Sequence, residues 1–134
     1  LDDVWSDLPL NYRTVAIPHM PNLFMLNGPY SPGGSASVVG ILEEQTGYLL
    51  QLLDRIAAEN VLLKPREDAA RDWLEGVRTL ARQTVWAQGG CNSWYLDKTG
   101  TPAYNPISIT ELKSSMAAPV MDDFIATPRE PEPA

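Results

Sequence analysis

Cysteine and histidine each occur once in the 134 residues, as Cys91 and His19. One thiol cannot form a disulfide within the chain, and no cysteine–histidine cluster offers a metal site. We therefore expect no bound metal and a reducing, cytoplasmic location. No histidine–nucleophile or paired acid–base arrangement is visible, so we predict no catalytic residue in this chain. His19 is interpreted as a loop residue and Cys91 as a packed one.

Long apolar runs and positive charge are also scarce. No stretch approaches the roughly 20 apolar residues that cross a bilayer. Asp2 and Asp3 stand where a signal peptide would carry basic residues. The net charge of −7 repels phosphate backbones and anionic lipid, so neither nucleic acid nor a membrane is expected as a partner. We attribute the acidic excess to solvation of the surface.

The composition, 44% hydrophobic and 20% charged, is that of a globular protein. A chain of 134 residues fits one small domain or part of a larger one. Its start at Leu1 rather than Met indicates a partial chain. Proline and glutamate concentrate in residues 127–134, which we predict to be a disordered tail after a folded portion over 1–126.

Two helices dominate the predicted secondary structure. The first spans residues 36–59, with Ser35 or Ser37 as its N-cap, and the second opens at Pro65. Helical spacing of apolar residues assigns their inner faces: Val38, Leu42, Leu49, Leu53 and Ile56 in the first, and Ala70, Trp73, Val77, Leu80 and Thr84 in the second.

Short strands and loops fill the rest. Residues 14–17 are β-prone, and the apolar run 22–27 predicts a strand buried on both faces. A third short strand is expected at 61–63. Residues 93–96 read as an extended piece and 97–100 as a turn. Ser108 and Glu111 form a capping-box pattern that opens a short helix to about residue 118.

One unit could bind a ligand: the 22–27 strand, Gly28-Pro29, a small-residue loop and the first helix. Glycine lets a ligand approach the backbone closely. The helix start offers unpaired N–H groups and a positive dipole end. Together they suit a phosphate or a flavin pyrimidine edge at the carboxyl end of a strand. An ordinary strand–loop–helix connection explains the same pattern equally well.

Three further stretches are more specific. Residues 21–29 (PNLFMLNGP), 41–45 (ILEEQ) and 84–97 (TVWAQGGCNSWYLD) resemble, in order, the PNLF…GP, IE-x-Q and TVW…GGCNSWYLD segments of flavin-containing monooxygenases of the Baeyer–Villiger type. The similarity runs from about residue 15 to 100. It implies an α/β fold class, the C-terminal part of an FAD-binding Rossmann-like domain, with short strands, two main helices and an irregular C-terminal segment.

The resemblance also implies a cofactor site. Gly28 and Pro29, with Asn27 before them, would end the last strand of the FAD domain. Tyr30, Ser31 and the loop through Ser35 to Ser37 would lie beside the flavin ring, and the first helix would point its amino end at the flavin N1/O2 edge. Trp94 would lie near the nicotinamide cofactor, although packing in the core is an equally good interpretation of this residue. The loop 30–34 differs from the family's commoner NT-x-x-GH pattern.

The implied activity belongs to a parent protein. That protein would use NADPH, FAD and O₂ to insert one oxygen into a ketone or soft nucleophile, a small organic substrate. No G-x-G-x-x-G and no F-x-G-x-x-x-H-x-x-x-W pattern occurs here. The expected partner is therefore the remainder of the flavoprotein chain, and the isolated chain is expected to be inactive, marginally folded or associating. A non-oxygenating flavin oxidoreductase and a non-enzymatic acidic domain without flavin are the alternatives.

Overall fold

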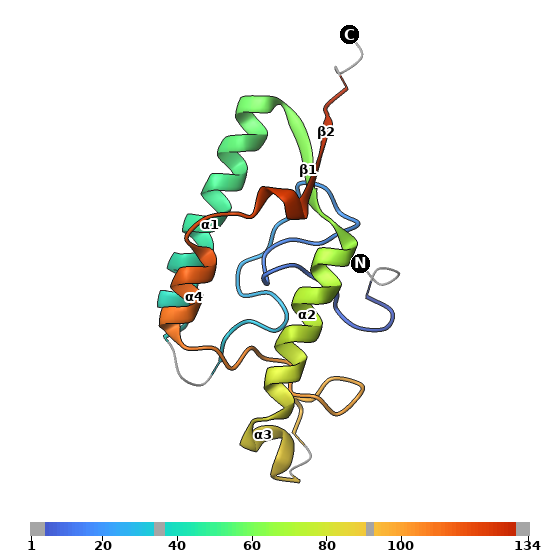
Figure 1. Cartoon of the computed structure of the whole chain (residues 1–134), viewed down its shortest axis with the longest axis vertical. Helices are drawn as coiled ribbons and strands as arrows, with labels where there is room; N and C mark the ends of the chain where they lie inside the picture. Colours follow the sequence, from blue (N-terminus) through green and yellow to red (C-terminus); the bar gives the residue numbers. More distant parts are fainter. Residues whose placement is uncertain (1–4, 34–36, 91–92, 131–134) are drawn as a thin grey trace.

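Two long helices flank a looped N-terminal segment in the computed structural model, which describes residues 5–33, 37–90 and 93–130 (Figure 1). These are α1 (Val38–Glu59) and α2 (Glu67–Arg82). The shorter elements are β1 (Val61–Pro65), α3 (Val85–Gln88), α4 (Ile109–Met116), the 3₁₀ helix η1 (Met121–Asp123) and β2 (Phe124–Pro128). The two main helices expected from the sequence are both present.

β1 and β2 form an antiparallel pair in register from Val61 opposite Pro128 to Pro65 opposite Phe124. The short strand predicted after α1 is therefore confirmed. Thr127, predicted to lie in a disordered tail, is instead paired within β2, as is Pro128. Composition misplaced this boundary because it cannot reveal that β1 supplies a pairing partner. Residues 131–134 lie outside the described part of the chain.

Asn22 closes the other edge of β1. Its backbone N–H donates to the Leu63 carbonyl (2.9 Å), and its side-chain oxygen accepts from the Leu63 N–H (2.7 Å). Its side-chain nitrogen donates to the Val61 carbonyl (3.4 Å). One asparagine thus provides the hydrogen bonds that a third strand would make here.

The strand predicted over 22–27 is wrong for this structure. Asn22 and Asn27, at its two ends, have left-handed φ values of 56° and 53°, which interrupt an extended backbone. Only Phe24 makes a bridge, to Ala16. Leu23 and Leu26 are 40% and 46% exposed, so the run is not buried on both faces. An apolar run becomes a strand only where neighbouring strands pair with it.

The face that α1 buries also differs from the prediction. Its buried residues are Ile41, Gln45, Tyr48 and Leu52. Val38 and Leu53, predicted to face inward, are 55% and 42% exposed, and Leu42, Leu49 and Ile56 are half-buried. The helix is apolar on two sides, so spacing alone could not decide which side meets the core.

α2 follows the prediction more closely. Glu67 and Asp68 occupy its first turn as expected, although Pro65 belongs to β1 and Arg66 is the N-cap. Ala70 and Val77 are buried as predicted. Leu80 is 46% exposed, whereas Arg78, two residues earlier, is buried. Trp73 and Thr84 are half-buried.

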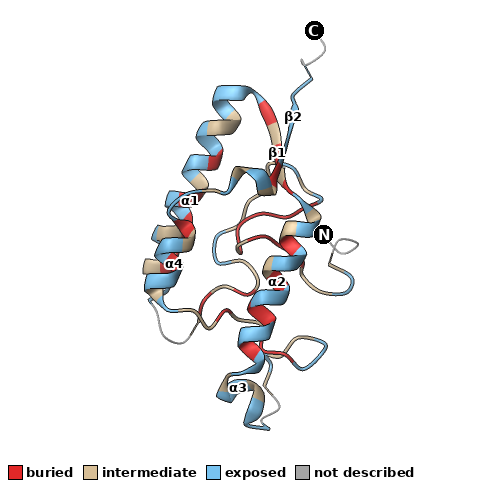
Figure 2. Cartoon of the chain, in the orientation of Figure 1, coloured by how far each residue is buried: buried red, intermediate tan, exposed pale blue. Residues whose placement is uncertain are grey.

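The core is centred on the N-terminal segment, which winds between α1 and α2 (Figure 2). Val15, Ala16 and Ile17 are fully buried, although only Ala16 makes β-bridges, to Tyr12 and Phe24. A core built on turns leaves backbone groups without a helix or sheet partner. Buried polar side chains supply those partners, and they are the most informative residues around the candidate site.

The C-terminal segment is mostly local turns. The capping box is confirmed: the Ser108 hydroxyl accepts from the Glu111 N–H (3.2 Å), and the Glu111 carboxylate accepts from the Ser108 N–H (2.8 Å). Its helix, α4, ends at Met116, two residues short of the prediction. The turn at 97–100 is also confirmed, with Gly100 at φ 79°. Residues 93–96 form a turn rather than an extended piece, and only Leu96 bridges, to Pro102.

Candidate functional site: the 27–33 loop and its supports

Gly28 lies where the loop passes against another backbone segment. A Cβ added at this position would stand 2.3 Å from the Thr14 carbonyl oxygen and 3.0 Å from the Met25 Cε. The close approach that requires glycine is therefore to Thr14, inside the protein. The sequence had suggested that this glycine makes room for a ligand, whereas the structure gives it a packing reason.

Gln45 holds the loop from the middle of α1. The Asn27 N–H donates to its side-chain oxygen (2.7 Å), and its side-chain nitrogen donates to the hydroxyl oxygens of Thr14 (2.6 Å) and Ser31 (3.2 Å). Gln45 is fully buried. Gln45 lies in the 41–45 stretch that resembles the family, and the resemblance assigns it no role. Its polar side chain on the same helical face as Ile41 was the available signal.

Asn11 supports the loop from the other side. Its side-chain nitrogen donates to the Pro29 carbonyl (3.3 Å) and the Pro9 carbonyl (2.8 Å), and its oxygen accepts from the Thr14 N–H (2.9 Å). Like Gln45, Asn11 is fully buried. The two amides fix the positions of Asn27, Pro29 and Ser31 before any ligand arrives.

The start of α1 is open to an electron-rich group. Ser37 is the N-cap, is exposed, and makes no side-chain capping hydrogen bond. The first turn holds no acidic residue, and Val38 and Val39 are 55% and 65% exposed. The positive end of the helix dipole is therefore accessible and not neutralised by the helix's own carboxylates. The prediction for Ser35 falls outside the described residues.

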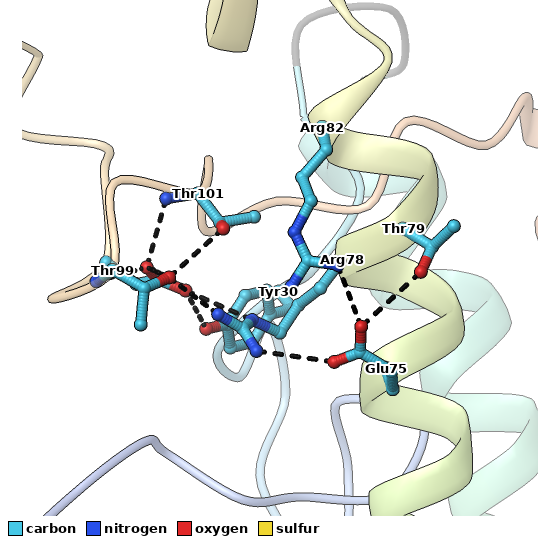
Figure 3. A network of polar contacts seen from close by, with 8 residues as sticks. Tyr30, Glu75, Arg78, Thr79, Arg82, Thr99 and Thr101 are labelled. Carbon is cyan, nitrogen blue, oxygen red and sulfur yellow. Dashed lines mark hydrogen bonds and ion pairs between the residues drawn. The ribbon is translucent and has the colours of Figure 1, made fainter.

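Tyr30 points into the protein. Its side chain is 1% exposed, and its hydroxyl donates to the Asp97 carboxylate (2.9 Å) (Figure 3). Burial, reinforced by that carboxylate, raises the pKa of Tyr30 well above its usual value. The phenol therefore stays protonated as a donor, and a cofactor beside this loop would meet the backbone of Tyr30, which has a left-handed φ of 60°.

The aromatic residues after α2 lie outside the core. Trp94 is 84% exposed and stacks on Tyr95 with ring centroids 4.0 Å apart. Trp86, 60% exposed, meets Tyr104 edge-on. Core packing, one of the two interpretations of Trp94, does not hold in this structure. An apolar hollow lies between these rings and the 27–33 loop, lined by Gly33, Trp86, Ser93, Tyr95, Leu96, Pro102 and Tyr104.

The remaining candidate groups are His19, any metal-binding cluster and Cys91. His19 lies 3.2 Å from the Glu67 carboxylate, and both side chains are more than 40% exposed. Within residues 5–33, 37–90 and 93–130, no three His, Cys, Asp or Glu side chains gather as a metal site would require. Across that same part, none of the helices has the length and apolar character needed to cross a membrane. Cys91 lies outside the described residues.

Comparisons with known proteins agree with the resemblance seen in the sequence. No family model matches the chain. An uncharacterized monooxygenase of Mycobacterium tuberculosis is 36% identical over 118 residues, 87% of this chain and 24% of that protein. An FAD-binding monooxygenase of Aspergillus terreus is 33% identical over 74% of the chain and 18% of that protein. A Baeyer–Villiger monooxygenase of Streptomyces coelicolor is 39% identical over 60% of the chain and 16% of that protein.

The chain is homologous to part of the FAD-binding, Baeyer–Villiger-type monooxygenases. It spans about a quarter of the length of the first relatives that it matches. Cyclohexanone monooxygenase from Rhodococcus sp. Phi1, bound to NADP⁺, superposes with a TM-score of 0.81 at 20% identity, over 96% of this chain and 25% of that one.

An oxidized steroid monooxygenase bound to NADP gives the same TM-score, 0.81, at 21% identity, over 96% of this chain and 25% of that one. These structures confirm the fold class expected from the sequence, part of an α/β monooxygenase fold. A third solved structure, OTEMO in complex with FAD and NADP, superposes with a TM-score of 0.76 at 21% identity, over 95% of this chain and 24% of that one. The two cofactors that the resemblance implied are thus those recorded for proteins of this fold.

The pKa of Asp97 determines how its contribution to the free energy of unfolding depends on pH. Burial alone would raise the pKa of Asp97, but hydrogen bonds from Thr99, Thr101 and Tyr30 outweigh burial and lower it. A lowered pKa means that the stabilisation is complete above the unfolded value, about 3.9, and is lost as the pH falls through the lower folded value. We expect the stability difference between wild type and Asp97→Asn to stay constant from about pH 5 to 8 and to shrink below about pH 4. Urea unfolding across this range measures it, and a difference that changes between pH 6 and 8 would contradict the assignment.

Proposed function

We propose that this chain forms one wall of the FAD site in a larger monooxygenase. That enzyme uses NADPH and O₂ to insert one oxygen into a ketone or another soft nucleophile. Sequence identities of 33–39% to FAD-binding and Baeyer–Villiger monooxygenases support the reaction class. The coverage of about a quarter of the first relatives supports the remainder of a longer chain as the partner. A cytoplasmic location stays a prediction.

The open amino end of α1 is the observation that carries the FAD assignment. Flavin accumulates negative charge at its pyrimidine edge on reduction, and an uncompensated helix dipole stabilises such charge. The buried amides of Gln45 and Asn11 fix the loop that leads to this helix end. When bound, FAD would supply the redox and oxygen chemistry. The protein groups orient it, with the backbone of 27–31 beside the ring and the Ser37 end of α1 toward its pyrimidine edge.

The loop that carries the exposed residues Trp94 and Tyr95 supplies a second element of the proposal. Trp94 offers a free aromatic face for the nicotinamide cofactor, and the hollow between Tyr95, Tyr104 and Gly33 is apolar enough for a small organic substrate. No described residue of this chain forms an acid–base pair in that hollow. Its side chains would therefore bind and shield rather than transfer protons.

A negative charge placed at the start of α1 distinguishes the proposed FAD binding from a purely structural role of this helix end. Ser37→Asp adds a better N-cap and a favourable dipole interaction, so α1 should be at least as stable. In the full-length protein the same carboxylate would oppose negative charge on the flavin. We expect roughly tenfold weaker FAD retention or a markedly lower flavin reduction potential, measured by flavin absorbance and redox titration.

Ser114→Asp, an exposed serine on α4, is the matched control and should leave both readouts unchanged. Wild-type full-length protein should carry flavin, oxidise NADPH and oxygenate a ketone or sulfide. NADPH oxidation with an artificial acceptor, but without an oxygenated product, would assign the chain to a non-oxygenating oxidoreductase. A full-length protein without flavin absorbance would overturn the proposal and leave a non-enzymatic domain.

A further inference from the structure

Asp97 bonds to Tyr30, Arg78, Thr99 and Thr101, and these partners are labelled in the buried polar network of Figure 3. Its side chain is 5% exposed, and that of Arg78 is 10% exposed. One carboxylate oxygen accepts from the Tyr30 hydroxyl (2.9 Å) and from the Arg78 Nε (3.3 Å). The other accepts from the Thr99 N–H (2.8 Å) and hydroxyl (2.7 Å) and from the Thr101 N–H (3.1 Å). Five donors on one buried carboxylate leave it fully satisfied.

These bonds join three parts of the chain that are distant in sequence. Tyr30 belongs to the loop at 27–33, Arg78 to α2, and Asp97 to the turn that follows Trp94. Arg78 adds a bond from its Nη2 to the Thr99 hydroxyl (2.6 Å). Its contact to Glu75 is on the solvent side, because that carboxylate is 57% exposed. Asp97 is therefore the partner that neutralises the buried side of Arg78.

Backbone hydrogen bonds close the base of the loop that carries Trp94 and connect it to this network. The Asp97 N–H donates to the Thr101 carbonyl (2.8 Å), and the Ala103 N–H donates to the Tyr95 carbonyl (2.8 Å). Trp94 itself projects from this closed base and is 84% exposed. Any displacement of Asp97 would therefore move the tryptophan relative to the loop at 27–33.

We propose that Asp97, through its bonds to Tyr30 and Arg78, is a positioning residue that sets Trp94 at a fixed distance from the loop at 27–33. This inference rests on the proposed function, in which Trp94 meets the nicotinamide cofactor beside FAD. Asp97 touches neither cofactor in this arrangement. It connects the loop at 27–33 to the loop that carries Trp94, so that the flavin and the nicotinamide would be held in a fixed relative position.

Tyr30→Phe tests the coupling with least disturbance, because it removes one hydroxyl and retains the buried ring. Asp97→Asn is the stronger variant, since it also leaves Arg78 without its buried counterion. Glu75→Gln, which removes the exposed partner of the same arginine, is the matched control. Each is made in the full-length protein. Hydrogen–deuterium exchange is followed in peptides covering 28–33 and 93–104, and NADPH oxidation gives KM and kcat.

For Tyr30→Phe we expect faster exchange in both peptides and a roughly tenfold higher KM for NADPH, the size of one hydrogen bond to a charged group. KM should change more than kcat, because the variant disturbs where the nicotinamide cofactor binds rather than the chemical step. Asp97→Asn should shift KM further, and Glu75→Gln should shift neither readout. Unchanged exchange and KM in both Tyr30→Phe and Asp97→Asn would overturn the inference. So would a loss of flavin with KM unchanged, because that would show a general structural role.

A failure of the proposed function looks different. Full-length wild type that carries no flavin and oxidises no NADPH overturns the monooxygenase proposal and the cofactor role of Asp97 with it. The exchange data would then still decide the physical coupling of the two loops.

Discussion

Gly28→Ala is expected to lower the free energy of unfolding by about 3 kcal/mol, at the upper end for overpacked sites. The new Cβ would lie 2.3 Å from the Thr14 carbonyl oxygen, so one of two backbone segments must move. Neither can move easily, because Gln45 and Asn11 bind both sides of the contact. The measurement is the urea midpoint of the shortest length of the protein that unfolds cooperatively.

Gly33→Ala is the control for this prediction. It lies in the same loop, yet its added Cβ would meet Tyr104 at 3.8 Å, an ordinary van der Waals contact. We expect a change within about 0.5 kcal/mol. Equal effects of the two substitutions would show that the approach to Thr14 does not determine the residue at position 28.

Replacing Gln45 with methionine, which has a similar shape, is the second large effect. It should cost about 3 kcal/mol, because the Asn27 N–H and the Thr14 and Ser31 hydroxyls lose their buried partner together. In the full-length protein we also expect loss of flavin, since the loop at 27–31 would no longer be held in place. Thermal melting and flavin absorbance measure the two consequences separately.

Gln51→Met is the matched control on the same helix. Gln51 is exposed, and its side-chain nitrogen donates to the carbonyl oxygens of Gly47 and Ala117, both at 3.2 Å. Water can replace these bonds, so the expected change is within about 0.5 kcal/mol. A loss of stability in Gln51→Met as large as in Gln45→Met would contradict the importance of the buried network.

Local features of this fold could be predicted from the sequence, because neighbouring residues determine them. The capping box at Ser108, the turn at 97–100 and the presence of α1 and α2, each of which begins two residues after its predicted start, depend on residues within a few positions of one another. The face that α1 buries could not be predicted. Its two sides are similarly apolar, and the choice depends on the N-terminal segment that packs against Gln45 and Tyr48.

The candidate site divides in the same way. The loop at 27–31 and the exposed Trp94 were identified through their resemblance to a family. Gln45, Asp97 and Arg78 were missed because their roles come from bonds between segments up to 67 residues apart. The apolar run at 22–27 misled for a related reason: two left-handed asparagines end it, and within the described residues its one β-bridge joins Phe24 to Ala16.

The asparagine at position 22 has a further consequence for how this protein behaves in a crowded solution. The free edge of a two-stranded sheet is a template on which another chain can add a strand. Here the backbone N–H of Asn22 occupies the Leu63 carbonyl, and its side chain occupies the Leu63 N–H and the Val61 carbonyl, so an incoming strand finds those groups already bonded. Asn22 thus protects this edge of β1 from pairing with another chain, and a single residue does what would otherwise require a whole covering strand.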